Sequence, residues 1–470
     1  MNERKSITDD FPGRYGKPRG KGLPKKRLEV LHPHAAGIDV GSRHHYVSVA
    51  EDCDQDPVRR FGCYTPELEA MASWLKDCGI TTVVMEATGV FWIPVFYVLE
   101  ERGLEVLLVN PRHVQYVPGR KSDVADCQWL RQLHTYGLLR GAFVPASDVA
   151  AVRAYWRQRR NLVESASREI QHMQKALPQM NIQLSTTLSD ITGVSGMKIL
   201  RAIVAGQRDP QALAQLANTK VKCSREEIVQ SLTGHYTDEQ LFLLQQALEL
   251  YDIFHVKIQE CDQRLAQYLE LFPSKAEPSA LAPHPKRPKR ARRKNQPYFD
   301  LRSEVYRLAG VDLTRIDGID AMTAFTVLSE IGFDVTAFPT EGEFVSWLAL
   351  CPNHRITGGK VKRRSTKQVV NRAANALRTA AQSLWHSTTY LGACYRRYNG
   401  RLGPAKTITA MAHKLARLIY HMLKHGEEYV DKGQEHLEKQ HRERSIKSLI
   451  HRAKEFGLTL VDTQTGECLA

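Results

Sequence analysis

This chain of 470 residues has no pairing pattern among its cysteines and no long apolar run. Its nine cysteines are scattered, odd in number and never spaced Cys-x-x-Cys. That argues against a disulfide framework and a structural zinc site, and it favours a reducing cytoplasm. The longest apolar stretch, Val90–Leu99, contains Pro94 and is far shorter than the ~20 residues that span a bilayer. The polar N-terminus lacks the apolar core of a secretory signal. We therefore expect a cytoplasmic protein without a membrane anchor.

Acidic residues are too few to balance the basic ones. Lys and Arg number 66 against 51 Asp and Glu, which gives a formal net charge of +15. A positive field of this size favours a polyanionic partner, above all nucleic acid. Hydrophobic residues make up 42% of the chain, enough to form a core. The length exceeds that of one compact domain, so we expect two or three.

The N-terminal third predicts a basic arm followed by an α/β domain. Residues 1–34 are rich in Lys, Arg, Gly and Pro and predict a disordered arm. Apolar spacing in 35–147 predicts two strands within Ala35–Ala50, a helix over Glu67–Cys78, a strand over Thr81–Met85, a helix over Val90–Arg102, a strand over Leu104–Val109 and a helix from Ser122 to about Tyr136. Short β-branched runs are typical of strands buried on both faces. The order indicates a mixed sheet flanked by helices.

The remainder predicts mostly helix, so the fold class is α/β plus α. Residues 148–280 are poor in Gly and rich in Leu, Ala, Gln and Glu. They predict long helices, either a coiled-coil dimerisation region or a plain bundle. Residues 281–298 form a basic, proline-rich linker that either follows phosphates or is a simple tether. A small, mostly helical domain follows at 299–430, and a tail at 431–470.

The second domain opens with a helix, a turn and a helix over Leu313–Gly332. The turn is at Gly318. The pattern is close to a helix-hairpin-helix, whose turn amides face a DNA phosphate. The second glycine usual in that turn is Asp320 here. Two packed helices without a ligand are the alternative.

Four carboxylates lie at predicted strand ends and at a predicted helix start, where a catalytic metal site is expected. Asp39 lies within the first strand, and Glu86 follows a buried strand at the carboxyl edge of the sheet. Asp123 and Asp126 are three residues apart on a predicted helix, so they share a face. Four converging carboxylates repel one another, and a hard cation such as Mg²⁺ (or Mn²⁺) relieves that repulsion. Two such ions can stabilise both oxygens of a phosphoryl displacement.

The motifs around these four carboxylates resemble those of a known family. GIDVG with Asp39, MEATG with Glu86, and KSDVADCQWL with Asp123 and Asp126 are similar to motifs of the DEDD transposases of bacterial insertion sequences, relatives of the pilin-gene invertases. The Asn-Pro-Arg after the third buried strand and the stretch LALCPNHRITGGKVKRRSTKQVVNRAANALR continue the likeness. It extends from Ala35 to His425.

The resemblance implies more than the residues show. It implies a ribonuclease-H-like (RuvC-like) N-terminal domain, as in Holliday-junction resolvases, and a C-terminal transposase domain. Members use a non-coding guide RNA, the bridge RNA, that pairs with donor and target DNA, so pairing reads sequence while protein reads shape. They assemble as dimers and tetramers, with the acidic cluster of one subunit facing the second domain of another. A bacterial, nucleoid-associated location follows.

The resemblance also implies a hydroxyl nucleophile that forms a covalent phosphoprotein link. The family serine lies five residues after a proline, and Pro352 leads here to Thr357. Threonine keeps the hydroxyl, although its methyl group restricts rotation. Ser365 is the alternative nucleophile. Glycines and basic side chains nearby and in the linker would bind nucleic acid: Arg355, Gly358, Gly359, Lys360, Lys362, Arg363, Arg364, Lys286, Arg287, Lys289, Arg290, Arg292, Arg293 and Lys294.

Three other functions fit parts of the pattern. A metal-dependent nuclease or junction resolvase would use the same carboxylates with water as nucleophile, making Thr357 and Ser365 dispensable. A phosphotransferase of the actin and sugar-kinase type would share Gly-Ile-Asp-Val-Gly, but the chain has no second phosphate loop. A non-catalytic DNA-binding protein would not bind metal through the four carboxylates.

Overall fold

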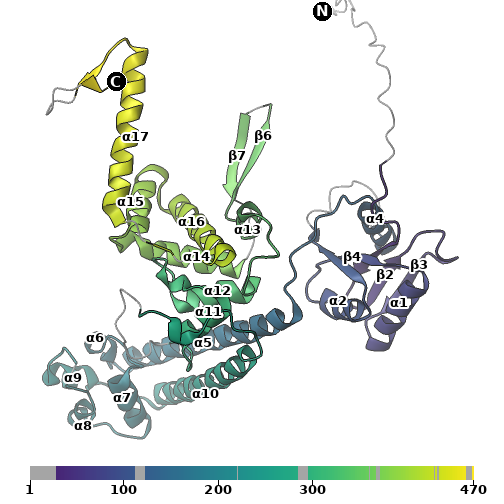
Figure 1. The fold of residues 1–470 in the computed structure, drawn as a ribbon. Coiled ribbons are helices and arrows are strands. Elements are labelled where there is room, and N and C mark those ends of the chain that lie inside the picture. The colour runs from purple at the N-terminus through teal and green to yellow at the C-terminus, as the bar shows by residue number, and fades with distance from the viewer. Residues whose placement is uncertain are drawn as a thin grey trace, which may run out of the picture. The chain divides into compact units, whose positions relative to one another are not determined.

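The computed structural model describes residues 28–111, 122–219, 221–283, 295–358, 360–366, 371–427, 429–430, 433–461 and 468–469. Most of the predicted basic arm, and residues 284–294 of the predicted linker, lie outside these ranges. The chain divides into two compact units, Met1–Val144 and Pro145–Ala470 (Figure 1).

The first unit is built on a five-stranded mixed sheet of order β3-β2-β1-β4-β5. Strands β1, β2 and β3 pair antiparallel, whereas β1, β4 and β5 pair parallel. Parallel strands buried on both faces explain the apolar runs seen in the sequence. The strand bounds are Ala35–Val40 for β1, His44–Ser48 for β2, Val58–Gly62 for β3, Thr82–Glu86 for β4 and Glu105–Val109 for β5.

Helices cover both faces of this sheet (Figure 1). Helices α1 (Thr65–Asp77) and α2 (Trp92–Glu101) share an apolar core with one face. Helix α4 (Asp123–Thr135) lies on the other face, where its Leu130 packs with Val84 and Val109. The mixed α/β architecture expected from the sequence is therefore present.

Two details differ from the sequence-based expectation. Strand β3 was not predicted, because Arg59 and Arg60 interrupt its apolar pattern. The sheet order places β3 at the edge, where exposed charged residues are common. Glu86 is the last residue of β4 rather than the first residue after it.

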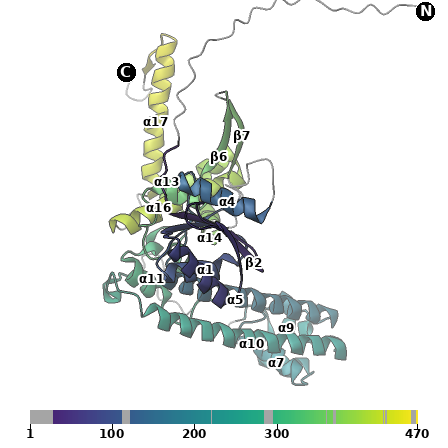
Figure 2. The same cartoon turned by 90° about the vertical axis from the view of Figure 1, so that its right-hand side faces the viewer.

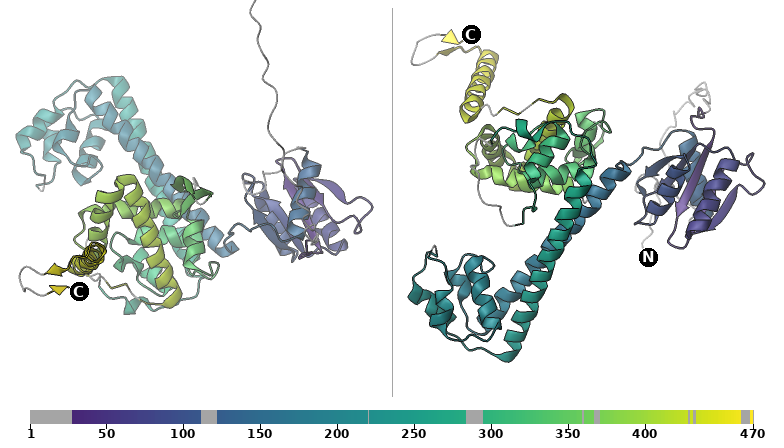
Figure 3. Two further views of the ribbon diagram at one scale, coloured as in Figure 1. Left: turned by 90° about the horizontal axis from the view of Figure 1, so that it is seen from above. Right: turned by 60° about the horizontal axis from the view of Figure 1, so that its bottom comes forward.

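The second unit begins with two long helices, α5 (Ser147–Gln179) and α10 (Asp238–Leu269), which run side by side (Figure 2). Tyr155 contacts Tyr268, and Arg159 pairs with Asp262, so the two helices are antiparallel. Four short helices share the apolar core at the far end of this pair (Figure 3). They are α6 (Leu184–Thr187), α7 (Val194–Val204), α8 (Pro210–Gln215) and α9 (Arg225–Leu232).

A buried ion pair joins the two long helices to the segment around residue 295. The side chains of Arg159 and Asp262 are only 3% and 0% exposed. Arg159 donates to the carbonyl of Asn295 at 3.0 Å, and the amide of Tyr298 donates to Asp262 at 3.2 Å. Breaking one partner of such a pair costs about 3–5 kcal/mol, because it leaves a buried charge uncompensated.

The rest of the second unit is mostly helical, as the sequence predicts. Its helices are α11 (Leu301–Ala309), α12 (Ala321–Ile331), α13 (Glu341–Trp347), α14 (Arg372–Ser383), α15 (Tyr390–Leu402), α16 (Pro404–His425) and α17 (Gly433–Glu455). Short 3₁₀ turns occur at Pro278–Ala280, Leu313–Arg315 and Leu384–His386. The region expected to be a C-terminal tail thus contains a helix. None of the helices within the described ranges combines the length and apolarity needed to cross a membrane.

Strands also occur in the second unit. Strands β6 (Pro352–Thr357) and β7 (Lys360–Thr366) form an antiparallel hairpin (Figure 1). Gly358 follows β6 as a turn residue, and glycine is common in short hairpin turns. A second small pair, β8 (Leu460–Val461) and β9 (Cys468–Leu469), follows α17.

Candidate active site

Two of the predicted carboxylates lie on neighbouring parallel strands. Ile38 of β1 pairs with Met85 of β4, so Asp39 and Glu86 are each one residue further along. Side chains at matching positions of parallel strands point to the same face, about 4.8 Å apart along the hydrogen-bonding direction. The sheet therefore places Asp39 and Glu86 next to each other. Both side chains are partly exposed.

The other two carboxylates begin helix α4. The hydroxyl of Ser122 accepts a hydrogen bond from the amide of Ala125 at 3.2 Å and caps the helix. The cap fixes the first turn, which contains Asp123 and Asp126. Both are exposed. Two acidic residues in the first turn also suit the positive end of the helix dipole, so the cap and the acids both favour a helix start here.

Gly37 brings α4 directly against β1. A methyl group in place of its hydrogen would lie 2.3 Å from the carbonyl oxygen of Cys127 and 2.5 Å from the amide nitrogen of Arg131. No side chain fits in that space. Gly37 and Asp39 share a face of β1, so this contact carries the first turn of α4 towards Asp39. Sequence reasoning missed the role of Gly37, although its place two residues before Asp39 was a usable signal.

Side-chain hydrogen bonds hold the C-terminal half of α4 on the sheet. The Nε2 of His134 and the hydroxyl of Thr82 on β4 are 2.9 Å apart and buried. Arg131 donates to the hydroxyl of Ser48 on β2 at 3.3 Å. The helix is thus attached to two strands as well as packed on a third.

The charges of the four carboxylates act on one another. Burial, then repulsion by Asp123 and Asp126, raises the pKa of Asp39 from 3.8 to about 6. Burial, then repulsion by Asp39 and Asp126, raises the pKa of Glu86 as well. Each predicted residue therefore takes part in one electrostatically coupled group.

The side chains do not form a closed ligand cage as they stand. Across the described residues, no group of three or more His, Cys, Asp or Glu side chains is arranged to hold a metal ion. Like charges repel one another, so an open arrangement of the carboxylates agrees with the repulsion described above. The donors at the site are all carboxylate oxygens, which suit a hard divalent cation.

Cys127 adds no soft ligand to this group. Burial, together with the charge of Asp39, raises the pKa of its thiol to about 12. The thiol donates to the carbonyl of Val124 at 3.1 Å. The thiolate rather than the thiol is the metal ligand and the nucleophile, so the raised pKa disfavours both roles for Cys127.

Thr357, the predicted nucleophile, is the last residue of β6 and pairs with Lys360. Thr357, Gly358 and Lys360 are exposed. Gly358 has a φ of +56°, a conformation that side chains disfavour. A hydroxyl at the end of a hairpin is accessible to a large substrate.

Ser365, the alternative nucleophile, pairs with Asn353 near the base of the hairpin. Thr357 lies four positions beyond Asn353 along β6, or about 13 Å at the usual rise per residue. The two hydroxyl residues therefore cannot serve the same phosphate without a large rearrangement. Because the two residues lie at different positions in the hairpin, substituting each in turn can identify the nucleophile.

The basic residues expected to bind nucleic acid are only partly visible. Arg355 stands opposite Arg363 in the hairpin, and the register shifts between Arg355 and Ile356. Side-chain positions are described for neither these arginines nor Lys362, Arg364 and Ser365. Gly359 and the predicted linker residues lie outside the described ranges: Lys286, Arg287, Lys289, Arg290, Arg292, Arg293 and Lys294.

The predicted helix-hairpin-helix is seen as a 3₁₀ turn followed by α12. Gly318 lies between them with a φ of +86°. The carboxylate of Asp320 accepts from the amide of Thr323 at 2.9 Å and caps α12. An acidic cap occupies the place where a phosphate would bind, because both accept from the same amides.

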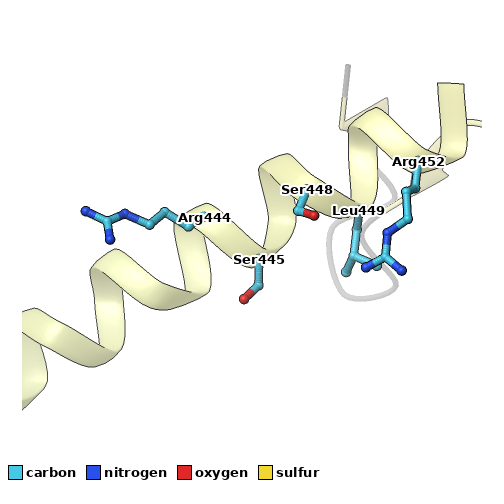
Figure 4. A pocket seen from close by; sticks show the side chains of 5 residues that line it. All are labelled: Arg444, Ser445, Ser448, Leu449 and Arg452. Atoms are coloured by element: carbon cyan, nitrogen blue, oxygen red, sulfur yellow. The ribbon is translucent and has the colours of Figure 1, made fainter. Parts of the chain in front are cut away.

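A hollow on α17 offers a contrast to the carboxylate group. Arg444, Ser445, Ser448, Leu449 and Arg452 line it (Figure 4). All five come from one helix, and none is acidic. This hollow has no pair of groups that could activate a nucleophile, so it does not mark an active site.

The comparisons with known proteins agree with this geometry. The family model of the IS110-type DEDD transposases, described as "Transposase", matches residues 36–182. A second model, described as "Transposase IS116/IS110/IS902 family", matches residues 312–396. No curated protein matches the chain. The first match contains all four carboxylates, and the second contains the hairpin with Thr357 and Ser365. The chain belongs to the IS110-type DEDD transposases and is a DNA transposase.

Proposed function

We propose that this transposase cuts and rejoins DNA through a covalent link to Thr357, with a divalent cation held by Asp39, Glu86, Asp123 and Asp126. The observation that carries the proposal is the electrostatic coupling of the carboxylates on β1, β4 and α4. Burial, then mutual repulsion, raises the pKa of Asp39 and of Glu86, and a divalent cation bound by these carboxylates would offset that repulsion.

The residues present fit Mg²⁺ or Mn²⁺. All four donors are carboxylates, and the nearby thiol of Cys127 remains protonated. When bound, the cation supplies Lewis-acid stabilisation of charge on the phosphate oxygens. Asp39 and Glu86 would hold it from the sheet, and Asp123 and Asp126 from the helix.

The hydroxyl of Thr357 carries the covalent step. Its oxygen forms a bond to the phosphorus and loses its proton to solvent, while the bond from phosphorus to the 3′ oxygen breaks. The 3′ oxygen takes up a proton. The reverse attack by a new 3′ hydroxyl restores a phosphodiester and frees Thr357. One ester replaces another, so no ATP is needed.

A denaturing gel with end-labelled DNA tests the nucleophile. The wild-type chain and Ser365→Ala should give an adduct that survives denaturation, whereas Thr357→Ala should give none. Thr357→Ser, which keeps the hydroxyl, is the matched control and should retain the adduct. An adduct lost only in Ser365→Ala would move the role to the base of the hairpin. Cleavage by both alanine variants without any adduct would indicate a water nucleophile, as in a nuclease or junction resolvase.

Guide-RNA dependence is the second part of the proposal. The net charge of +15 supports a large polyanionic partner. The test adds a transcript of the non-coding DNA beside the gene to the purified chain with donor and target DNA. Joined product should appear only with the transcript and should disappear after ribonuclease treatment. Joining without any RNA would refute this part and leave the Thr357 proposal intact.

Self-association is the third part, and α10 carries its support. Five apolar side chains on α10 are 41–60% exposed: Phe242, Leu243, Leu250, Ile253 and Val256. At 100° per residue they lie on one side of the helix, away from Leu244 and Tyr251 in the buried core. A second copy of α10 would cover this stripe in a homodimer. Two such dimers would form a homotetramer. Ile253→Lys should lower the mass measured by sedimentation, whereas Leu138→Glu, at an exposed site elsewhere, should not.

A further inference from the structure

Helices α5, α12 and α14 pack together in the second unit. Trp156 of α5 lies against Phe325 of α12, with ring centroids 4.8 Å apart. Its indole N–H donates to the hydroxyl of Thr326 at 3.1 Å. Helix α14 packs on α12 in turn. This junction is apolar in its centre and charged at its edge.

One buried carboxylate at that edge forms ion pairs with two arginines. Glu330 of α12 has a side chain only 7% exposed. Arg157 of α5 donates to both of its oxygens, at 2.9 and 2.6 Å. The guanidinium of Arg153 lies 3.3 Å from the same carboxylate and also donates to the carbonyl of Glu330. Both oxygens of Glu330 are therefore occupied by α5.

A further arginine nearby has no such partner. Arg372 is the first residue of α14, and its buried Nη1 has no hydrogen-bond acceptor among the described residues. Burial, then the charge of Arg157, lowers the pKa of Arg372; Arg160 acts in the same direction, and Glu330 and Glu164 act against it. Arg160 and Glu164 pair with each other at 2.9 Å.

The charges at this junction do not cancel. Four guanidiniums, those of Arg153, Arg157, Arg160 and Arg372, face two carboxylates, which leaves two positive charges. A guanidinium stays charged at any physiological pH, so it cannot relieve the excess by losing a proton. A buried donor without an acceptor is also unfavourable. Among the described residues, the junction therefore carries an excess of positive charge that an anion would offset.

We propose that Arg372, together with Arg153 and Arg157, forms a binding site for a phosphodiester of the nucleic acid that the transposase handles. The side chain of Arg157 is 41% exposed, and its Nε and Nη2 donate to Glu330, so a phosphate would approach the remaining edge of the guanidinium. Two acceptor oxygens of a phosphate match the fork of an arginine. Arg372 also stands at the N-terminus of α14, where the helix dipole favours an anion. The site depends on the family's nucleic-acid substrate and not on guide RNA or Thr357.

Binding of the full-length chain, measured at several salt concentrations without divalent cation, tests the site separately from catalysis. The probes are duplex DNA, single-stranded DNA and single-stranded RNA of one length. Arg372→Met should weaken binding of the probe whose backbone occupies the site about fivefold to tenfold. The slope of log affinity against log salt concentration for that probe should become less steep by about 0.7–0.9. Arg201→Met removes an exposed arginine paired with Asp252 and is the control for loss of one charge. It should change neither quantity.

Thermal unfolding without nucleic acid separates this role from a structural one. Arg372→Met removes an unsatisfied buried charge, so its Tm should equal or exceed that of the wild type. Arg372→Lys should keep the salt slope, because it keeps the charge, but bind less tightly, because it lacks the fork. The probe whose slope changes identifies the bound backbone. An unchanged slope for all three probes, or a lower Tm with unchanged binding, would overturn the proposal.

Discussion

At the level of single residues, Asp39 holds a charge that its surroundings oppose. Its pKa is raised from 3.8 to about 6, so the folded chain favours the protonated form of Asp39 more than the unfolded chain does. The associated stability is present below the unfolded pKa of 3.8 and is lost as pH rises through about 6. At neutral pH, without cation, the ionised group therefore destabilises the protein.

Asp39→Asn should consequently stabilise the metal-free protein while removing activity. The expected gain at neutral pH is about 1–3 kcal/mol, and it should vanish below pH ~4. Added Mg²⁺ should raise the Tm of the wild type but not of the variant. Thermal unfolding with chelator and with Mg²⁺ provides both comparisons. A variant that is less stable than the wild type in chelator would contradict the repulsion described here.

His134 gives the opposite dependence on pH. Burial, then the charge of His32, lowers its pKa from 6.5 to about 4. Its stability contribution is present above 6.5 and is lost as pH falls towards 4, amounting to about 2 kcal/mol between pH ~7.5 and pH ~5. His134→Gln should remove this part of the acid-induced loss in denaturant unfolding. Identical pH dependence in both proteins would show that His134 does not titrate in this way.

At the level of elements, the contact between β1 and α4 decides whether the carboxylates meet. Gly37→Ala would force α4 away from the strand, because the obstructing atoms are backbone atoms of Cys127 and Arg131. Displacements near 1 Å at an active site cost on the order of 100-fold in rate. We expect cleavage to fall by about that factor, together with a loss of stability of ~1–3 kcal/mol.

Gly400→Ala is the matched control for Gly37→Ala. Gly400 lies in α15, and a methyl group there would meet nothing within 4 Å. The substitution should be neutral or stabilising by up to ~1 kcal/mol. Wild-type cleavage by Gly37→Ala would show that α4 can shift without disturbing the carboxylates.

The elements also show what the sequence could and could not predict. Strands β1, β4 and β5 were predictable because buried parallel strands leave continuous apolar runs. Strand β3 and the β6–β7 hairpin were not, because their Arg and Lys residues hide the two-residue alternation. The functional side chains were predictable as residue types at strand ends and helix starts. The contact at Gly37 and the charges around Glu330 were not, since both depend on which helix packs where.

At the level of the whole molecule, each unit contributes one half of the proposed chemistry. The carboxylates belong to the first unit, and Thr357 belongs to the second. A mixture of Asp39→Asn and Thr357→Ala chains tests whether the halves act across subunits. Each variant alone should form no adduct. Adduct should return on mixing if the carboxylates of one subunit serve Thr357 of another, and should stay absent if each chain serves itself.

Residues on both sides of the basic stretch at 286–294 are held on the second unit by hydrogen bonds. Asn295 and Tyr298 are held by Arg159 and Asp262, and Arg302 donates to the carbonyl of Ala282 at 2.8 Å. Both borders of the stretch are thus fastened to one folded body. A protease nick between them would leave the two fragments associated under native conditions. Both ends produced by the nick would therefore stay bound to the second unit through the contacts of Ala282 and Asn295.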